Sequence, residues 1–170
     1  MTDPEAVVVT GVYGVGKTTV VEEMAEQLEN TGLTFAAVDL DWLWWFNVPS
    51  LDDDAVDRIG LANLSAVARN YVDAGVTHLM LAGAIEDDTG VAQIRQALRC
   101  PLLVVRLTLP YPEIENRLAG AVTTGRQIDL RQSEDWIRED FGAGIGDLVM
   151  VNDRPVQTVA RDILSWLGWT

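Results

Sequence analysis

The chain has 170 residues and a formal net charge of −14, with 12 Lys and Arg against 26 Asp and Glu. Because proteins bind a phosphate backbone mainly through Lys and Arg, this balance argues against a nucleic-acid-binding protein. A hydrophobic content of 48% suits one globular domain with a full core. The single cysteine excludes an internal disulfide, and the single histidine argues against a Cys/His metal cluster.

The N-terminal segment does not resemble a targeting signal. Residues 1–5 are acidic, and the apolar run that follows them is short, so we expect no signal peptide. The other apolar runs are also much shorter than a membrane span. These features predict a cytoplasmic protein that does not associate with a membrane.

The most informative motif covers residues 11–18 and matches the P-loop pattern G-x-x-x-x-G-K-S/T. The apolar run at 7–9 predicts a strand before it, and helical spacing predicts a helix after it. Glycines let successive amides face phosphate oxygens, and the helix N-terminus adds positive charge. Lys17 is predicted to reach the β- and γ-phosphates, and the Thr18 hydroxyl to ligate Mg²⁺. The predicted nucleotide-binding residues of this segment are Gly11, Gly14, Val15, Gly16, Lys17, Thr18 and Thr19.

The rest of the chain alternates between predicted strands and helices, which implies a parallel sheet with helices on both faces. We expect helix caps at Thr89 and Ser133, and an arginine-bearing loop over residues 120–131. The later predicted strands cover 35–38, 77–82, 102–105 and 148–151. The later predicted helices cover about 52–75, 89–99, 112–118, 133 onward and 156–167.

Three further segments, together with the P-loop, carry a resemblance to a known family. They are 39–41 (Asp-Leu-Asp), 117–120 (Arg-Leu-Ala-Gly) and 152–156 (Asn-Asp-Arg-Pro-Val). With them the chain resembles the small P-loop kinases of the nucleoside-monophosphate-kinase type, including shikimate and gluconate kinases and chloramphenicol phosphotransferase. The resemblance implies an α/β, three-layer P-loop NTPase fold in a single domain over 1–170. It also implies a parallel five-stranded sheet of order 2-3-1-4-5 and a lid over about 119–132.

Asp39 and Asp41 follow the second predicted strand. In open α/β sheets ligands bind at the carboxyl ends of the strands, so both carboxylates are expected beside the P-loop. Similar kinases place an Asp here as general base, because the attacking hydroxyl must be oriented and must lose its proton. We assign Asp41 as the base, with Asp39 as the alternative or as an outer-shell Mg²⁺ partner. The competing interpretation is that one of them caps the next helix.

Arginines near the predicted lid form the third part of the resemblance. In similar kinases an Arg at the position of Arg117 lies against the adenine, and lid arginines clamp the transferring phosphoryl group. The usual second Arg, four residues on, is Ala121 in this chain. Arg126 or Arg131 would therefore substitute for it, and we assign Arg117 and Arg126 as catalytic.

Two strand ends give weaker signals. Asn152 and Arg154 follow the last predicted strand, in the segment that borders the adenine in similar kinases. The third predicted strand lacks the terminal Asp that holds the Mg²⁺ water shell in many P-loop proteins, and Glu86 and Asp87 come only later. This departure counts against a motor or switch ATPase.

Aromatic residues occupy most of segment 42–46, directly after the proposed base. They would either line an acceptor pocket or pack in the core or a dimer contact. We expect at least one Trp in the pocket, which would give the acceptor a flat or apolar part. Trp136, Trp166 and Trp169 are expected to be structural, and Cys100 to be a packing residue.

Together these features predict a Mg²⁺-ATP-dependent kinase that transfers the γ-phosphoryl group to a hydroxyl of a small molecule. The alternative is a nucleotide-binding sensor without a phosphoryl acceptor, which would not need Asp41. A polynucleotide kinase shares the P-loop and the Asp, but the negative net charge disfavours it. A homodimer is compatible with the sequence, which does not specify the oligomeric state, the acceptor or the choice between ATP and GTP.

Overall fold

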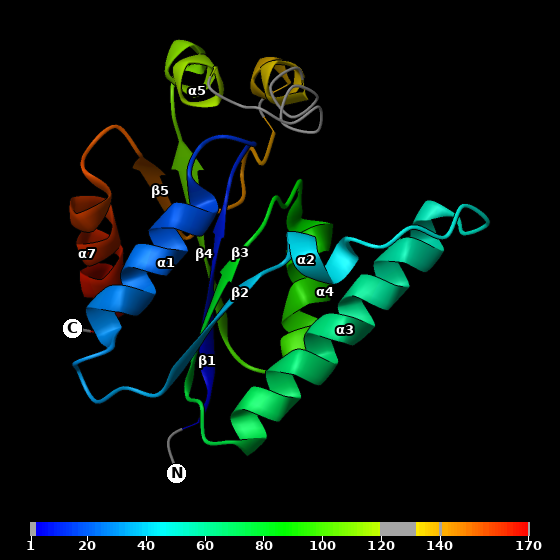
Figure 1. Cartoon of the computed structure of the whole chain (residues 1–170), viewed down its shortest axis with the longest axis vertical. Helices are drawn as coiled ribbons and strands as arrows, with labels where there is room; N and C mark the ends of the chain where they lie inside the picture. Colours follow the sequence, from blue (N-terminus) through cyan, green and yellow to red (C-terminus); the bar gives the residue numbers. More distant parts are fainter. Residues whose placement is uncertain (1–2, 120–131, 140, 170) are drawn as a thin grey trace.

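The computed structural model describes residues 3–119, 132–139 and 141–169. Its centre is a five-stranded parallel sheet of order β2-β3-β1-β4-β5 (Figure 1). In the register of this sheet, Val8 of the central strand pairs with Leu81 on one side and Val104 on the other. The strands are β1 (Glu5–Thr10), β2 (Phe35–Asp39), β3 (His78–Ala82), β4 (Leu102–Thr108) and β5 (Leu148–Val151).

Helices cover both faces of the sheet and so form three layers (Figure 1). α1 (Lys17–Leu28) and α7 (Val156–Leu167) pack together on one face. α3 (Asp53–Asp73) and α4 (Asp88–Leu98) pack on the other, with the one-turn helix α2 (Asp41–Trp44) against α3. α5 (Tyr111–Leu118) and a helix over residues 132–138 lie beyond the carboxyl ends of the strands.

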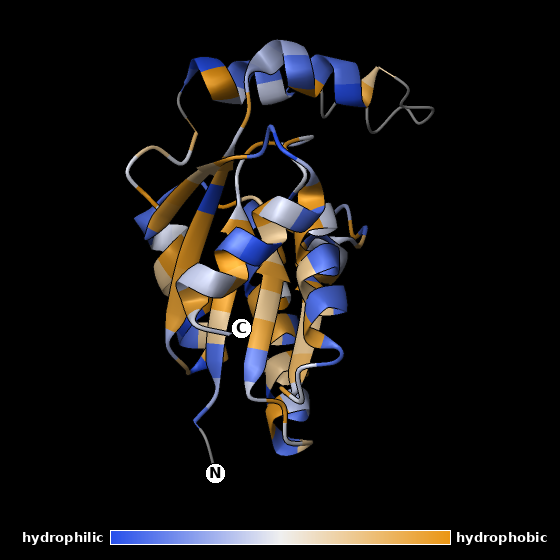
Figure 2. Ribbon diagram, turned by 90° about the vertical axis from the view of Figure 1, so that its left-hand side faces the viewer, coloured by the Kyte–Doolittle hydropathy of each residue, from blue (hydrophilic) through white to orange (hydrophobic). Residues whose placement is uncertain are grey.

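The apolar run of β1 explains this layering, because its successive side chains enter two separate cores. Val7 and Val9 pack with the apolar sides of α1 and α7, whereas Val8 packs with residues of α3 and α4. A strand of a parallel sheet that is covered on both faces is apolar throughout. Figure 2 shows the same pattern, with apolar strands between helices that are polar on their outer sides.

The predicted order of strands and helices is confirmed, whereas two predicted caps are wrong. α4 begins one residue earlier than expected, and its N-cap is Asp87, whose carboxylate accepts from the amide of Gly90 at 2.9 Å. Ser133 is fully buried, and its hydroxyl donates to the carbonyl of Tyr13 at 2.9 Å instead of capping its helix. The contact of Ser133 is tertiary, whereas the cap of α4 is a local contact of a neighbouring polar residue.

β4 is longer than the predicted strand, since Arg106 and Thr108 pair with Val149 and Val151 of β5. Most of the predicted lid, residues 120–131, lies outside the described part of the chain. Within the part that the structure describes, no helix is long and apolar enough to cross a membrane.

Candidate active site

The P-loop joins the end of β1 to the start of α1. Gly11 has φ 136° and Gly16 has φ 100°, values that residues with a Cβ rarely adopt. A Cβ at Gly11 would lie 2.5 Å from the carbonyl oxygen of Leu107, and one at Gly16 would lie 2.7 Å from Nδ2 of Asn152. The first amides of α1 have no intrahelical acceptor, so the loop and helix start can together bind an anion.

A cavity of about 510 Å³ lies beside this loop. It brings together most of the residues that the sequence assigns to nucleotide binding or catalysis. Gly11 does not line it, because this glycine packs against β4, and neither does the buried Val15. Arg126 lies outside the described residues. The lining residues are Tyr13, Gly14, Gly16, Lys17, Thr18, Thr19, Asp41, Arg117, Leu118, Asn152, Arg154 and Val156.

Arg117 and Asn152 brace the P-loop through the carbonyl of Val15. Nη1 of Arg117 donates to this oxygen at 3.2 Å, and Nδ2 of the buried Asn152 donates to it at 2.7 Å. Nη2 of Arg117 also donates to the carbonyl of Asn152 at 2.6 Å. Arg117, Asn152 and the P-loop are distant in the sequence, and they meet at the carbonyl oxygen of Val15. The sequence around Arg117 and around Asn152 does not indicate this contact. Arg154 lines the same cavity and pairs with Asp162 at 2.7 Å.

Lys17 is only 7% exposed, although it carries a positive charge. Its ammonium donates to the carbonyl of Val12 at 3.1 Å and lies 5.1 Å from the ring centroid of Tyr13. A carbonyl acceptor and the face of an aromatic ring both stabilise a cation that has lost much of its hydration. The lysine is thus held at the wall of the cavity.

Asp39, at the end of β2, bonds both to the P-loop and to the start of α2. Its Oδ2 accepts from the hydroxyl of Thr18 at 2.8 Å, and its Oδ1 accepts from the amide of Asp41 at 2.9 Å. Asp39 thus accepts from the first amide of α2, although the N-cap position of this helix is Leu40. The hydroxyl and carboxylate oxygens beside the cavity are of the type that Mg²⁺ prefers, so this pair fits the cation implied by the fold.

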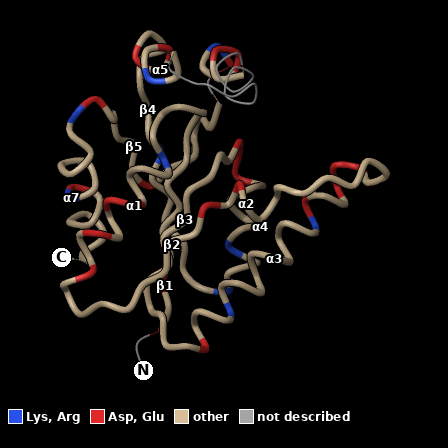
Figure 3. Tube along the Cα trace, in the orientation of Figure 1, with Lys and Arg blue, Asp and Glu red and all other residues tan. Residues whose placement is uncertain are grey.

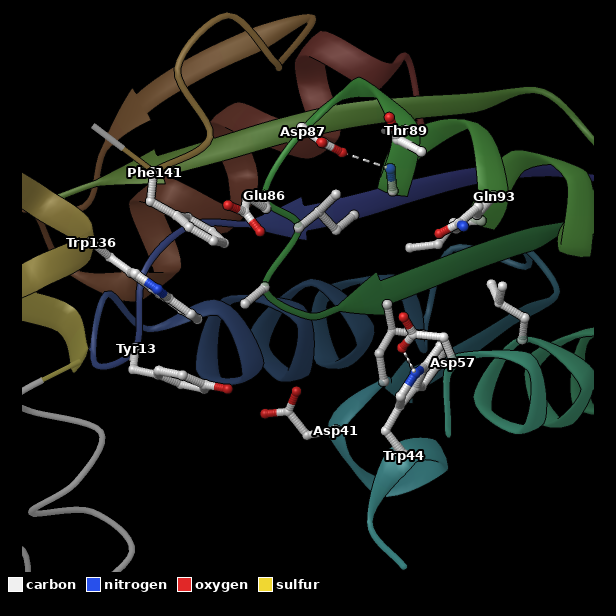
Figure 4. A pocket seen from close by; sticks show the side chains of 16 residues that line it. Tyr13, Asp41, Trp44, Asp57, Glu86, Asp87, Thr89, Gln93, Trp136 and Phe141 are labelled. Carbon is white, nitrogen blue, oxygen red and sulfur yellow. Dashed lines mark hydrogen bonds between the residues drawn. The ribbon is translucent and has the colours of Figure 1, made fainter. Parts of the chain in front are cut away.

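A second cavity, of about 520 Å³, is also lined by Asp41 (Figure 4). Asp41 and Tyr13 line both cavities. Asp41 follows β2 and Tyr13 follows β1, so both shared residues lie at the carboxyl edge of the sheet. The remaining lining residues are Leu40, Trp44, Asp57, Leu61, Ala84, Ile85, Glu86, Asp87, Thr89, Gly90, Gln93, Ile94, Trp136 and Phe141.

Three stacked aromatic rings form one wall of the second cavity. The ring centroids of Trp136 and Tyr13 lie 4.8 Å apart, and the angle between the two ring planes is 19°. On the other side of Trp136 the ring of Phe141 lies 4.0 Å away at 11°. Trp136, which was expected to be structural, packs partly buried against the core and also lines this cavity. Only the fold brings its helix to the P-loop, so local sequence carries no signal for this contact beyond the aromatic residues themselves.

The tryptophans after Asp41 separate into one that lines the cavity and two that do not. Trp44 lines it, and its Nε1 donates to Oδ1 of Asp57 on α3 at 3.1 Å. Trp42 and Trp45 are 69% and 74% exposed and contact each other. At least one tryptophan of segment 42–46 thus lines a cavity, as expected.

Comparison with known proteins gives structural similarity only. No protein-family model matches the chain, and no curated protein matches it by sequence. A sugar kinase from Janibacter sp. HTCC2649 shares 24% identity over 97% of this chain and 95% of its own, with a TM-score of 0.69. The APS kinase CysC of Mycobacterium tuberculosis, in complex with AMPPNP and APS, shares 21% identity over 99% of both chains, with a TM-score of 0.68.

Shikimate kinase from Acinetobacter baumannii, in complex with shikimate, is also similar. It shares 18% identity over 97% of this chain and 93% of its own, with a TM-score of 0.58. At these identities the similarity concerns the fold, and it confirms the fold implied by the sequence. The chain has the three-layer fold of the small P-loop kinases, with the sheet order β2-β3-β1-β4-β5.

Proposed function

We propose that this protein is a Mg²⁺-ATP-dependent kinase that transfers the γ-phosphoryl group to a hydroxyl of a small molecule. The observation that carries the proposal is the position of Asp41, which lines both the cavity beside the P-loop and the second cavity. Transfer requires the nucleophile and the phosphoryl group to be held in line and close together. A carboxylate that lines both cavities would serve this step.

The first cavity would hold the nucleotide. Its glycine-rich loop and the start of α1 supply amides for the phosphates, and Lys17 supplies a buried positive charge. Thr18 and Asp39 would hold Mg²⁺, which when bound neutralises the negative charge that develops on the phosphate oxygens. Asn152 and Arg154 are assigned to the nucleotide side of the same cavity.

Asp41 would orient the acceptor hydroxyl and accept its proton, and the second cavity would hold the rest of the acceptor. Arg117 keeps the P-loop in place through Val15, and its guanidinium lines the nucleotide cavity. With Arg126 it would place positive charge near the transferring group, an arrangement that phosphoryl transfer requires. The assignment of Arg126 depends on the resemblance alone.

An acceptor screen tests the proposal. Purified protein is incubated with Mg²⁺-ATP and a library of nucleosides, sugar acids, aminocyclitols and phenicol-like antibiotics, and products are identified by mass spectrometry. We expect a molecule that gains one phosphoryl group, and no product with Lys17→Ala. Asp41→Asn should bind ATP normally but transfer roughly 10²–10⁴-fold more slowly. Asp73→Asn, an exposed substitution at the end of α3, is the matched control.

The outcome separates two classes of protein. Tight ATP binding without any phosphorylated product would contradict the kinase proposal and favour the nucleotide-binding sensor. Near-full transfer by Asp41→Asn would leave a kinase but refute the assignment of the base. Equal loss of rate in Asp41→Asn and Asp73→Asn would show that the effect is not specific to the site.

A further inference from the structure

The second cavity has an unusual distribution of charge. Four carboxylates line it, whereas no lysine, arginine or histidine does so in the part of the chain that the structure describes. The carboxylates come from three separate places, namely α2, α3 and the segment between β3 and α4. Figure 3 shows acidic positions near α2 and near the start of α4, at the carboxyl end of the sheet. The four residues are Asp41, Asp57, Glu86 and Asp87.

These carboxylates do not form a metal site. Among the described residues, no group of three or more His, Cys, Asp and Glu side chains could hold a metal ion. Two of the four are fixed in orientation, since Asp57 accepts from Nε1 of Trp44 at 3.1 Å and Asp87 accepts from the amide of Gly90 at 2.9 Å. The negative charge is thus distributed around the cavity, where a ligand of organic size would meet it.

The aromatic wall adds a preference for a flat apolar group. Tyr13, Trp136 and Phe141 stack on one another along this wall, and Trp44 lies on another side of the cavity (Figure 4). The stacked faces cover one another, and Lys17 already lies against the Tyr13 ring, so the row of rings offers apolar surface for a flat group. Glu86 lies near the rings of this wall in the same view.

We propose that the molecule bound in the second cavity is an organic cation, namely an amine that carries a hydroxyl and a flat apolar part. An acceptor with a carboxylate would meet like charges on several sides, and like charges repel one another. The exposed Glu86 carboxylate would pair with the ammonium group, which makes it the residue that selects charge. The inference rests on the proposed function only in treating this molecule as the phosphoryl acceptor.

Three matched probes test the charge preference. Phenylalaninol, N-acetylphenylalaninol and 3-phenyllactate share a phenyl ring and a hydroxyl, but they carry a positive, no and a negative charge at neutral pH. Their affinities are measured by titration calorimetry with Mg²⁺ and AMPPNP present, so that no transfer is needed. We expect phenylalaninol to bind roughly tenfold more tightly than the neutral amide, and 3-phenyllactate to bind most weakly.

A pair of variants assigns the preference to the cavity. Glu86→Gln should weaken binding of phenylalaninol roughly tenfold and leave the neutral amide unchanged. Glu29→Gln makes the same chemical change at the C-terminal end of α1, far from the cavity, and should change neither affinity. Equal affinities for the three probes, tighter binding of 3-phenyllactate or no binding of phenylalaninol would overturn the inference. An equal loss for the amine and the amide in Glu86→Gln would also overturn it.

The two proposals fail separately. If the amine binds selectively but ATP yields no phosphorylated molecule, the cation preference stands and the kinase proposal fails. If ATP is used to phosphorylate the hydroxyl of molecules that carry a carboxylate, but not of molecules that carry an amine, the kinase proposal stands and the cation preference fails.

Discussion

Gly60, in the middle of α3, determines how Trp44 sits in the wall of the second cavity. A Cβ added at this buried glycine would lie 2.5 Å from Nε1 of Trp44 and closer still to two carbons of the same ring. Carbon atoms pack at about 3.5–4.0 Å, so the indole of a Gly60→Ala variant must withdraw by more than about 1 Å. That movement also disturbs the hydrogen bond from Nε1 to Asp57.

Opposing terms set the size of the effect. Overpacking costs about 1–3 kcal/mol, and a lost hydrogen bond costs about 0.5–1.5 kcal/mol. Alanine is better than glycine inside a helix by about 1 kcal/mol, which offsets part of this cost. We therefore expect Gly60→Ala to lower the free energy of unfolding by about 2 kcal/mol, although the same change at an open helical site would raise it.

Urea unfolding followed by circular dichroism measures the change in the free energy of unfolding. An unchanged slope of this free energy against urea concentration shows that two-state behaviour is kept. A double-mutant cycle identifies the source of this change, because in a Trp44→Ala background Gly60→Ala should become stabilising by about 1 kcal/mol. Ala62→Gly, at an exposed site of the same helix, measures the helix-propensity term alone. If Gly60→Ala stabilised the parent protein, or destabilised both backgrounds equally, the packing argument would be refuted.

Two other predictions concern the P-loop brace and the single thiol. Asn152→Ala removes a buried donor to the carbonyl of Val15, so it should lower the free energy of unfolding by about 1–3 kcal/mol and weaken ATP binding. Asn70→Ala, exposed on α3, is the control, and equal effects of the two would contradict the assigned brace. Burial, followed by the charge of Glu5, raises the pKa of the Cys100 thiol above its ordinary value of 9.0. The folded state thus favours the neutral thiol, which contributes stability below the ordinary pKa and loses that contribution as pH rises through the raised pKa. At about pH 8 the folded protein should react with Ellman's reagent much more slowly than the urea-unfolded chain, and equal rates would contradict the burial.

The nucleotide side of the site could be anticipated because its parts are close in sequence. Eight consecutive residues carry the P-loop, and the apolar strand before it and the amphipathic helix after it have clear periodicities. The positions of Asp39 and Asp41 followed from the rule that parallel strands end at one edge of the sheet. The role of Arg117 and Asn152 in holding Val15 could not be anticipated, because it depends on three segments that meet only after folding.

The fold class and the position of the P-loop follow from the amino-acid sequence alone. Local periodicity and one contiguous motif are enough for that, since strands, helices and the loop between them are specified over short stretches of chain. The form of the second cavity, where Tyr13 stacks on Trp136 and Trp44 packs over Gly60, depends on tertiary contacts. The direction of a side chain in a short turn depends on what packs against it, and that partner lies far away in the sequence.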